Sequence, residues 1–262
     1  MYNNIANGTT YGGVGDVNKR FRRQLFSSIG DAIADHEMIQ AGDRILVAVS
    51  GGKDSLFMAW ALADIRKRSP IKFHLEAVTI DPGEPWQLSS AQLSAISSFL
   101  SGLGIPHHVV PSQIAQIVMN YPGNKTPCSL CANLRRGCLH QTASELGFNK
   151  VALGHTLDDA IETLFLNMFF TGSLRCFRPK TYLSRRRVEV IRPIVYVEEP
   201  WIVQAAKELA LPVAPAQCSY SGNTNRHSMK TLVAELSENI PGLRRKMTNV
   251  LKAVWRQMPA ID

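Results

Sequence analysis

The six residues from Ser50 to Ser55, SGGKDS, constrain the fold and chemistry of this chain more than any other segment. They follow the apolar run 44–49 (RILVAV), which is typical of a buried strand, and precede a helical pattern that ends near Arg68. Two glycines let the backbone approach an anion closely, successive N–H groups form a nest, and the helix start adds its positive end. The segment therefore predicts a phosphate-binding turn, with an ordinary glycine-rich turn as the alternative. Its spacing excludes the GxxxxGKS and GxxxxGKT loops of kinases and GTPases. The predicted phosphate-binding residues are Ser50, Gly51, Gly52, Lys53, Asp54 and Ser55.

Runs of apolar and β-branched residues alternate with helical periodicity along the 262 residues. This alternation predicts an α/β fold, in which helices cover both faces of a central parallel sheet, followed by a helical region beyond Pro193. We expect a loop that ends at Pro127 and another from Leu211 to Asn225. The expected strands are 44–49, 73–80, 107–110, 150–153 and 188–192. The expected helices include 21–33, 88–103, 130–146, 158–170, 200–209, 227–236 and 243–257, together with the one that ends near Arg68.

The composition is that of a folded protein with an excess of positive charge. Hydrophobic residues make up 45% of the chain, and no apolar run approaches the roughly 20 residues of a membrane-spanning helix. Lys and Arg outnumber Asp and Glu by 29 to 21, so that a nucleic acid is an expected partner. The Gly-, Asn- and Thr-rich start lacks the basic and apolar regions of a secretory signal. We therefore expect a cytoplasmic protein without membrane contact and with a flexible tail over residues 1–18.

A second polar segment, GHTLDD, follows the strand expected at 150–153 and opens the next helix. Thr156 and Asp159 have the spacing of a capping box, which alone explains the two acids structurally. The same strand end, however, should face the crevice that contains the phosphate-binding turn. Adjacent carboxylates near phosphates are the oxygen ligands that Mg²⁺ prefers, so Asp158 and Asp159 are candidate Mg²⁺ ligands. Gly154 and His155 are candidate nucleotide contacts, and a packed strand-end histidine is the alternative for His155.

Two cysteines, Cys128 and Cys131, open a predicted helix in the sequence PCSLCANLRRG. This spacing brings two thiols within reach of one metal, although a redox dithiol or two ordinary helix cysteines remain alternatives. A four-cysteine zinc ribbon is disfavoured because no second CxxC exists in the chain. A third ligand has three candidates. Cys138 lies two turns down the same helix, Cys176 lies among basic residues that we expect to face phosphate, and Cys218 lies in the polar loop.

Basic residues gather outside these motifs and predict contacts with nucleic-acid phosphates. A solvated helix face is the alternative for any single one of them. The groups are Arg175, Arg178, Lys180, Arg185, Arg186 and Arg187, then Arg244, Arg245, Lys246, Lys252 and Arg256, and finally Arg135 and Arg136 beside the CxxC.

The SGGKDS segment resembles the pyrophosphate loop, or PP-loop, of the ATP pyrophosphatases, which cleave ATP between its α and β phosphates to adenylate a substrate oxygen. The resemblance implies a Rossmann-like adenine nucleotide alpha-hydrolase fold. It also implies that the tip of the second strand contacts adenine and ribose, here through Val78, Ile80 and Asp81, at the sheet edge where α/β folds bind nucleotides. A plain turn at Asp81 is the alternative.

The cysteine segment, a distant loop cysteine, TLFLNMFFTG at 163–172 and IRP at 191–193 together resemble the tRNA 2-thiocytidine synthetases. In that family three cysteines hold a 4Fe-4S cluster, which implies Cys128, Cys131 and Cys218 here. A second cysteine often follows the third ligand, and Ser221 stands there in this chain.

The resemblance implies a tRNA sulfurtransferase that adenylates the C2 oxygen of a cytidine, at tRNA position 32, and replaces it with sulfur to give 2-thiocytidine. Asp54, Asp158, Asp159 and the three cysteines are then the expected catalytic residues, and ATP, Mg²⁺ and the 4Fe-4S cluster the expected cofactors. The implied partners are tRNA and a sulfur donor, either a cysteine desulfurase or free sulfide, and homodimers are common in the family. The implied domains are a PP-loop domain at 19–195 with the CxxC and a helical region at 196–262 with the third cysteine and a tRNA-binding surface.

Three other functions remain open from the sequence. A tRNA 2-thiouridine synthetase shares the same motifs, although this chain lacks the flanking zinc fingers of those enzymes. An ATP-dependent ligase or amidotransferase would use the same loop without a cluster. A tRNA-binding or iron–sulfur storage module would use the nucleotide site for regulation only.

Overall fold

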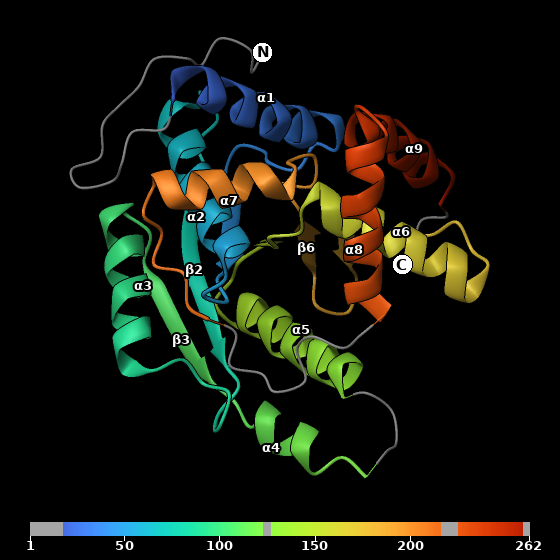
Figure 1. The fold of residues 1–262 in the computed structure, drawn as a ribbon. Coiled ribbons are helices and arrows are strands. Elements are labelled where there is room, and N and C mark those ends of the chain that lie inside the picture. Colours follow the sequence, from blue (N-terminus) through green and yellow to red (C-terminus); the bar gives the residue numbers. More distant parts are fainter. Residues whose placement is uncertain (1–17, 123–126, 216–224, 259–262) are drawn as a thin grey trace.

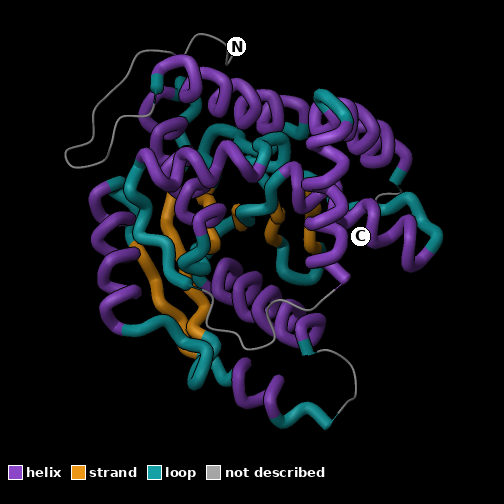
Figure 2. The backbone as a smooth tube through the Cα atoms, in the orientation of Figure 1, coloured by secondary structure: helices purple, strands orange, loops and turns teal. Residues whose placement is uncertain are grey.

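The structure is a computed structural model that describes residues 18–122, 127–215 and 225–258. A six-stranded sheet lies at its centre in the order β3-β2-β1-β4-β6-β5, with helices around it (Figures 1 and 2). The strands are β1 (Arg44–Ala48), β2 (His74–Asp81), β3 (His107–Pro111), β4 (Lys150–Ala152), β5 (Lys180–Leu183) and β6 (Val188–Ile191). The helices are α1 (Lys19–Asp35), α2 (Lys53–Arg68), α3 (Ser90–Gly102), α4 (Ile114–Met119), α5 (Cys128–Glu145), α6 (Leu157–Thr171), α7 (Glu199–Glu208), α8 (Asn225–Asn239) and α9 (Leu243–Gln257).

The order of the strands creates a crevice at one edge of the sheet. From β1 the chain proceeds outward to β2 and β3, and α5 then returns it to β4 on the opposite side of β1. All neighbouring pairs except β5 and β6 are parallel. Such a reversal separates the connections at the carboxyl ends of β1 and β4, which is where open α/β sheets bind ligands. The predicted α/β class and parallel sheet are therefore confirmed.

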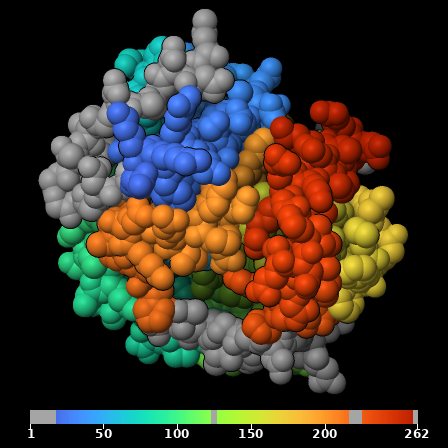
Figure 3. Space-filling view, turned by 45° about the horizontal axis from the view of Figure 1, so that its top comes forward, coloured from blue at the N-terminus to red at the C-terminus, as the bar shows by residue number. Residues whose placement is uncertain are grey.

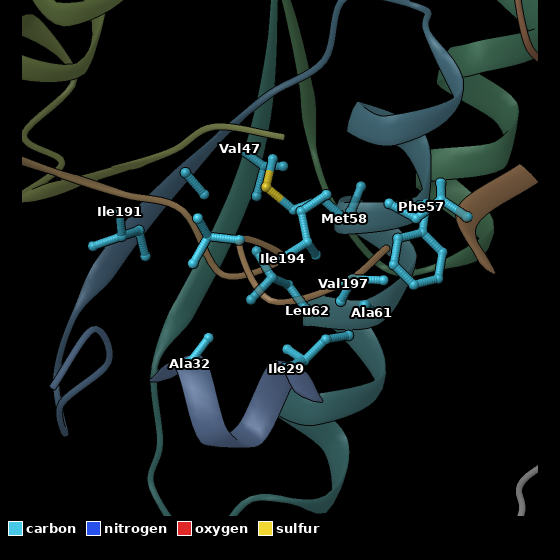
Figure 4. Packing of buried hydrophobic residues seen from close by; sticks show 14 of the residues in the cluster. Ile29, Ala32, Val47, Phe57, Met58, Ala61, Leu62, Ile191, Ile194 and Val197 are labelled. Atoms are coloured by element: carbon cyan, nitrogen blue, oxygen red, sulfur yellow. The ribbon is translucent and has the colours of Figure 1, made fainter. Parts of the chain in front are cut away.

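The two faces of the sheet bury different sets of side chains, because residues alternate in direction along a strand. Val47 of β1 packs in the larger core with Met58 and Leu62 of α2 and with Ile29 of α1 (Figure 4). Leu46 instead packs on the other face, in a smaller cluster with Leu139 and Ala143 of α5. The cysteine-bearing helix α5 thus covers the face opposite α2, while both helices begin near the crevice.

Two short elements differ from the sequence prediction. Helix α4 lies in a segment predicted as loop and packs Ile114 and Val118 against Trp86. Strand β5 lies in the segment predicted as a basic surface and pairs antiparallel with β6. Both elements were missed because they have only six and four residues, too few to show a period, and depend on their tertiary partners.

The helical C-terminal region shares the larger core with the sheet. Ile202 of α7 and Leu251 and Trp255 of α9 belong to the same buried cluster as β1 and α2. Helix α8 packs along α6. The region beyond the predicted boundary at residue 195 is thus packed on the PP-loop part throughout its described length. None of the helices among the described residues is long and apolar enough to span a membrane.

Candidate active site

The carboxyl ends of β1, β2, β4 and β6 open into one cavity of about 770 Å³. In Figure 3 the surface is hollowed between the orange segment that contains α7 and the red helix α8. Residues of both polar motifs, of the tip of β2 and of α5 line it together. Representative lining residues are Ser50, Asp54, Ser55, Val78, Ile80, Asp81, Arg135, Arg136, Gly154, His155, Phe177, Arg192, Pro215 and Arg226.

The phosphate-binding turn has the predicted position between β1 and α2. Gly51 adopts a φ of 83°, which a residue with a side chain rarely adopts. The Ser55 hydroxyl donates to the Gly52 carbonyl at 2.9 Å and accepts the Ser50 N–H at 3.2 Å, so this serine holds the loop in shape. The Gly51 carbonyl accepts the N–H of Ala214 at 2.9 Å. The chain before residue 216 is thereby fixed against the loop.

Lys53 and Asp54 differ in how far their charges are already balanced. The Lys53 ammonium lies 2.7 Å from Glu199 and 3.0 Å from Asp54, and Glu199 also pairs with Lys230 at 2.8 Å. Burial lowers the pKa of Lys53, but the two carboxylates more than offset this and raise it. Burial raises the pKa of Asp54, against the effect of Lys53. Its Oδ1 is buried without a hydrogen-bond partner among the described residues, so it is available to a bound ligand.

The two acids of GHTLDD have separate partners. The predicted capping box is confirmed, since Asp159 accepts the Thr156 N–H at 2.7 Å and donates its own N–H to the Thr156 hydroxyl. The other Asp159 oxygen lies 2.6 Å from Arg226. Asp158 is buried, and its two oxygens accept from the Glu199 N–H at 2.6 Å and from Arg244 at 2.8 Å. These contacts occupy both Asp158 oxygens and join α6 to α7 and α9, and the interpretation of Asp158 as a Mg²⁺ ligand stays a prediction.

His155 follows the end of β4, and one of its ring nitrogens is already in a hydrogen bond. Its Nδ1 lies 3.0 Å from the Nε of Arg192, which always carries a proton, so Nδ1 is the acceptor and Nε2 carries the hydrogen of the neutral ring. Burial, and then the charge of Arg192, lower the pKa of His155 to about 4. The ring also packs on Phe177, with centroids 4.8 Å apart. A neutral N–H donor at the cavity wall results.

Gly154 and Asp81 line the cavity and also shape the backbone around it. A Cβ at Gly154 would lie 3.1 Å from the Ser55 nitrogen, so glycine allows the end of β4 to approach the start of α2. At the tip of β2, Asp81 accepts the Gly83 N–H at 2.9 Å. This bond forms a turn, which was the alternative interpretation of Asp81. Val78 and Ile80 line the cavity beside it.

The described cysteines divide into two kinds. Cys128 and Cys131 lie on the first turn of α5, exposed and half-buried, and Ala132 directly after them lines the cavity. Cys138 packs in the small cluster around Trp86. Cys176 is buried, donates to the Ala160 carbonyl at 3.3 Å, and has its pKa raised by burial to about 12. Cys176 is therefore a buried core side chain.

Cys218 lies outside the described residues, but the chain on either side of it is placed. Pro215 and Arg226 both line the cavity. Among the described residues no group of three or more His, Cys, Asp or Glu side chains is arranged to hold a metal ion.

Several predicted phosphate-binding cations are instead paired inside the protein. Arg244 pairs with Asp158, Lys252 with Asp35 at 2.8 Å, and Lys180 with Glu189 at 3.3 Å. The reason is that helix α9 and strand β5 turn these side chains toward acids on neighbouring elements, which are β6, α6 and α1. By contrast, Arg185, Arg186 and Arg187 form an exposed turn between β5 and β6.

Four residues of the site were missed as functional from the sequence. Glu199, Arg226 and Lys230 surround Lys53 and Asp159 through ion pairs, and Arg192 contacts His155. Only Arg192 carried a signal, through the IRP segment. The other three lie in ordinary amphipathic helices, where the sequence pattern predicts that a charged residue is exposed to solvent.

Comparison with known proteins agrees with this geometry. Residues 18–230 match the PP-loop domain family, a match that runs across the predicted boundary at residue 195. The tRNA-cytidine(32) 2-sulfurtransferase of Geobacter sulfurreducens is 41% identical over 233 residues, which cover 87% of this chain and 89% of that protein. The protein of the same name from Pelobacter propionicus is 42% identical over 236 residues, which cover 88% and 86%.

Among solved structures, the U34-tRNA thiolase NcsA of Methanococcus maripaludis, with its 4Fe-4S cluster, has a similar fold. It superposes with a TM-score of 0.73 and 22% identity, over 91% of this chain and 80% of that one. The family match and the sequence relatives give the assignment: this chain belongs to the PP-loop domain family and, within it, to the tRNA-cytidine(32) 2-sulfurtransferases.

Proposed function

We propose that this protein uses ATP to adenylate the C2 oxygen of a cytidine in tRNA, at position 32, and replaces that oxygen with sulfur. ATP, Mg²⁺ and a 4Fe-4S cluster take part. The observation that carries the proposal is the single cavity in which the PP-loop, the β2 tip, His155 and the start of α5 meet. A nucleotide, a base and a sulfur source need to meet in one place for this reaction.

The nucleotide end of the cavity fits a triphosphate with a divalent cation. The N–H groups of the loop from Ser50 to Lys53 lie at the start of α2, whose dipole favours phosphate. The unpartnered Oδ1 of Asp54 is an oxygen donor of the kind that Mg²⁺ prefers, and Asp159 is the second candidate ligand. Val78 and Ile80 at the β2 tip supply apolar contacts for adenine and Asp81 a contact for ribose.

The cysteine end fits three-thiol ligation. Cys128 and Cys131 are one helical turn apart, and neither forms a disulfide. Cys218 is the proposed third ligand, because Pro215 and Arg226 bring both ends of its segment to the cavity. These three thiols would hold a 4Fe-4S cluster, which would carry the donor's sulfide to the base.

The protein's own residues orient the reacting groups. The loop and Lys53 hold the β and γ phosphates so that the C2 oxygen attacks the α phosphorus and pyrophosphate leaves. The Nε2–H of His155 donates to the α-phosphoryl group or to the activated oxygen, and its low pKa keeps it from carrying a charge at neutral pH. When sulfur attacks C2, AMP leaves with the original oxygen. The target base is unpaired in the anticodon loop, so its extrusion costs little.

The test is an anaerobic reaction of the purified protein with ATP, Mg²⁺, sulfide and a tRNA transcript. We expect tRNA-dependent pyrophosphate release and 2-thiocytidine in the digested product by mass spectrometry. A transcript with uridine at position 32 is the matched control. A colourless, iron-free protein that releases pyrophosphate with another substrate would support the ligase alternative instead, and thiolation of the uridine transcript would overturn the choice of base.

A further inference from the structure

Arg192 is a buried cation that no carboxylate among the described residues pairs with. The residue is 8% exposed and follows β6 at the wall of the cavity. Its Nε donates to His155 at 3.0 Å and its Nη1 donates to the Arg178 carbonyl at 2.6 Å. Both partners are uncharged, since His155 is neutral. These bonds use two of the five guanidinium N–H groups, and the guanidinium lies over the Phe177 ring, 5.0 Å from its centroid, so that a weak cation–π contact, and no carboxylate of the described residues, offsets the charge.

A buried charge without a carboxylate partner is costly, so its retention calls for a reason. Burial lowers the pKa of Arg192 to about 10, which still leaves the guanidinium charged at neutral pH. Of the segments outside the described residues, 123–126 and 216–224 contain no Asp or Glu, whereas the two terminal segments contain Asp16 and Asp262. A neutral side chain with two donors would satisfy both observed partners equally well. The charge itself therefore serves something that enters the cavity.

The charges around the cavity are divided between its two halves. The half over β1 and β2 contains the acids Asp54 and Asp81. The half over β4 and β6 contains His155, Arg192 and Arg226, of which Arg226 is offset by Asp159 and Glu162. Arg135 and Arg136 of α5 also line the cavity, and the charge of Arg136 lowers the pKa of both His155 and Arg192. This second half is positively charged, whereas the acids on the other half suit a bound cation.

We propose that the β4–β6 half of the cavity is a second phosphate-binding site, separate from the PP-loop, in which Arg192 binds the phosphate oxygens. The inference rests on the proposed function for the source of the phosphate. This is either the α-phosphoryl group of the nucleotide or a phosphodiester of the RNA strand beside the target base. Arg136, exposed at the cavity rim, adds charge to the same site.

Equilibrium binding without turnover tests the site and separates the two sources. Wild type, Arg192→Gln, Arg192→Lys and Arg136→Gln are titrated with two probes, α,β-methylene-ATP with Mg²⁺ and an anticodon stem-loop RNA. We expect Arg192→Gln to weaken one probe at least about tenfold, as expected for a charge-assisted bond to phosphate. Arg192→Lys should retain part of that affinity and Arg136→Gln should lose a smaller factor. The weakened probe identifies the source.

Controls keep the result independent of folding and of catalysis. Arg23→Gln removes one charge from the exposed face of α1 and should change both affinities less than twofold. Thermal unfolding measures the stability of each variant, and Arg136→Gln provides the test if Arg192→Gln does not fold. Affinities within twofold of wild type for both probes in Arg136→Gln and in the folded Arg192 variants would overturn the proposal. So would equal losses in Arg192→Lys and Arg192→Gln, since these indicate a structural residue. Failure of thiolation alone leaves the binding result intact.

Discussion

The two sides of the cavity are held together in different ways. On the side of β1 and α2, six consecutive residues form the phosphate-binding turn, and the serine hydroxyl bonds that hold its shape join residues no more than five positions apart, as from Ser50 to Ser55. On the side of α6 to α9, ion pairs join residues that are distant in the chain, such as Lys53 with Glu199 and Arg244 with Asp158. The first side is therefore held mainly by its backbone conformation, and the second is held mainly by ion pairs.

This difference determines what each side tolerates. The turn depends on glycine conformations and main-chain donors, which salt and pH scarcely affect. The ion pairs depend on partly buried carboxylates and on correct helix packing, so they respond to pH and to loss of one partner. The following changes are designed to affect one side without the other.

The largest effect is expected from the cysteines beside the cavity. Cys128→Ser, Cys131→Ser and Cys218→Ser each leave too few thiolates for a cluster, so we expect loss of nearly all iron and of thiolation. Iron and acid-labile sulfide contents after anaerobic purification measure this. Cys138→Ser and Cys176→Ser are the matched controls and should keep both. A fully active Cys218→Ala protein that retains iron would refute the three-ligand assignment, and iron loss in Cys138→Ser would point to another ligand set.

Asp54→Ala and Ser55→Ala should affect only the turn. Asp54 offers the unpartnered oxygen and Ser55 fixes the loop, so we expect tRNA-dependent pyrophosphate release to fall at least about 100-fold, as when one donor to developing charge is lost. Iron content should remain at the wild-type level. Asp31→Ala, on the exposed face of α1, is the control. Normal pyrophosphate release by both variants would contradict the assignment of this turn as the nucleotide-binding site.

Asp158→Asn should affect the electrostatic side. The change leaves Arg244, whose side chain is 20% exposed, with only the more distant carboxylate of Glu198 at 3.9 Å, and we expect a loss of about 3 kcal/mol in the free energy of unfolding. Asp159→Asn should cost less because Arg226 is 50% exposed, but should lower pyrophosphate release more. Urea denaturation and pyrophosphate release on both variants test this pair. Unchanged stability with an altered Mg²⁺ requirement in Asp158→Asn would instead support Asp158 as a metal ligand.

Reversal of Arg185, Arg186 and Arg187 to Glu tests the exposed turn between β5 and β6. We expect tRNA affinity to fall about tenfold at roughly 0.1 M salt and its salt dependence to flatten, because fewer phosphate contacts release counterions. Lys19, Arg20 and Arg23 on α1, reversed in the same way, match the change in charge. Binding titrations at several salt concentrations measure both. Equal effects of the two triple variants would make the turn an ordinary solvated surface.

The same division explains how much the sequence could predict. The turn from Ser50 to Ser55 and the capping box at Thr156 were predictable because they are local: their geometry follows from residues within five positions. The contacts of Asp158 could not be predicted, because Arg244 and the N–H of Glu199 lie far from it in the sequence. Strand β5 is defined by its pairing with β6, and its four residues carry no pattern of their own. These contacts and this strand could not be predicted, because they depend on how distant segments of the chain pack together.

The smallest effect is expected from Glu162, which lies one turn beyond Asp158 on α6 and is 4% exposed. Burial raises its pKa from 4.5 to about 7, Asp159 adds to this, and Arg226 opposes it. The folded state therefore holds a proton that the unfolded state releases near pH 4.5. Stability contributed by this group is complete at low pH, declines as pH rises, and levels off above about pH 7.

Between about pH 6 and pH 7.5 this group alone should lower the free energy of unfolding by about 1 kcal/mol. Glu162→Gln cannot titrate, so its stability should decline less over the same interval. Urea denaturation of both proteins at the two pH values measures the difference. The affinity of the PP-loop for nucleotide should stay unchanged in the variant, because Glu162 contacts Arg226 and not the turn. Parallel pH dependence in the two proteins would show that this side of the cavity is not governed by a buried, titrating carboxyl group.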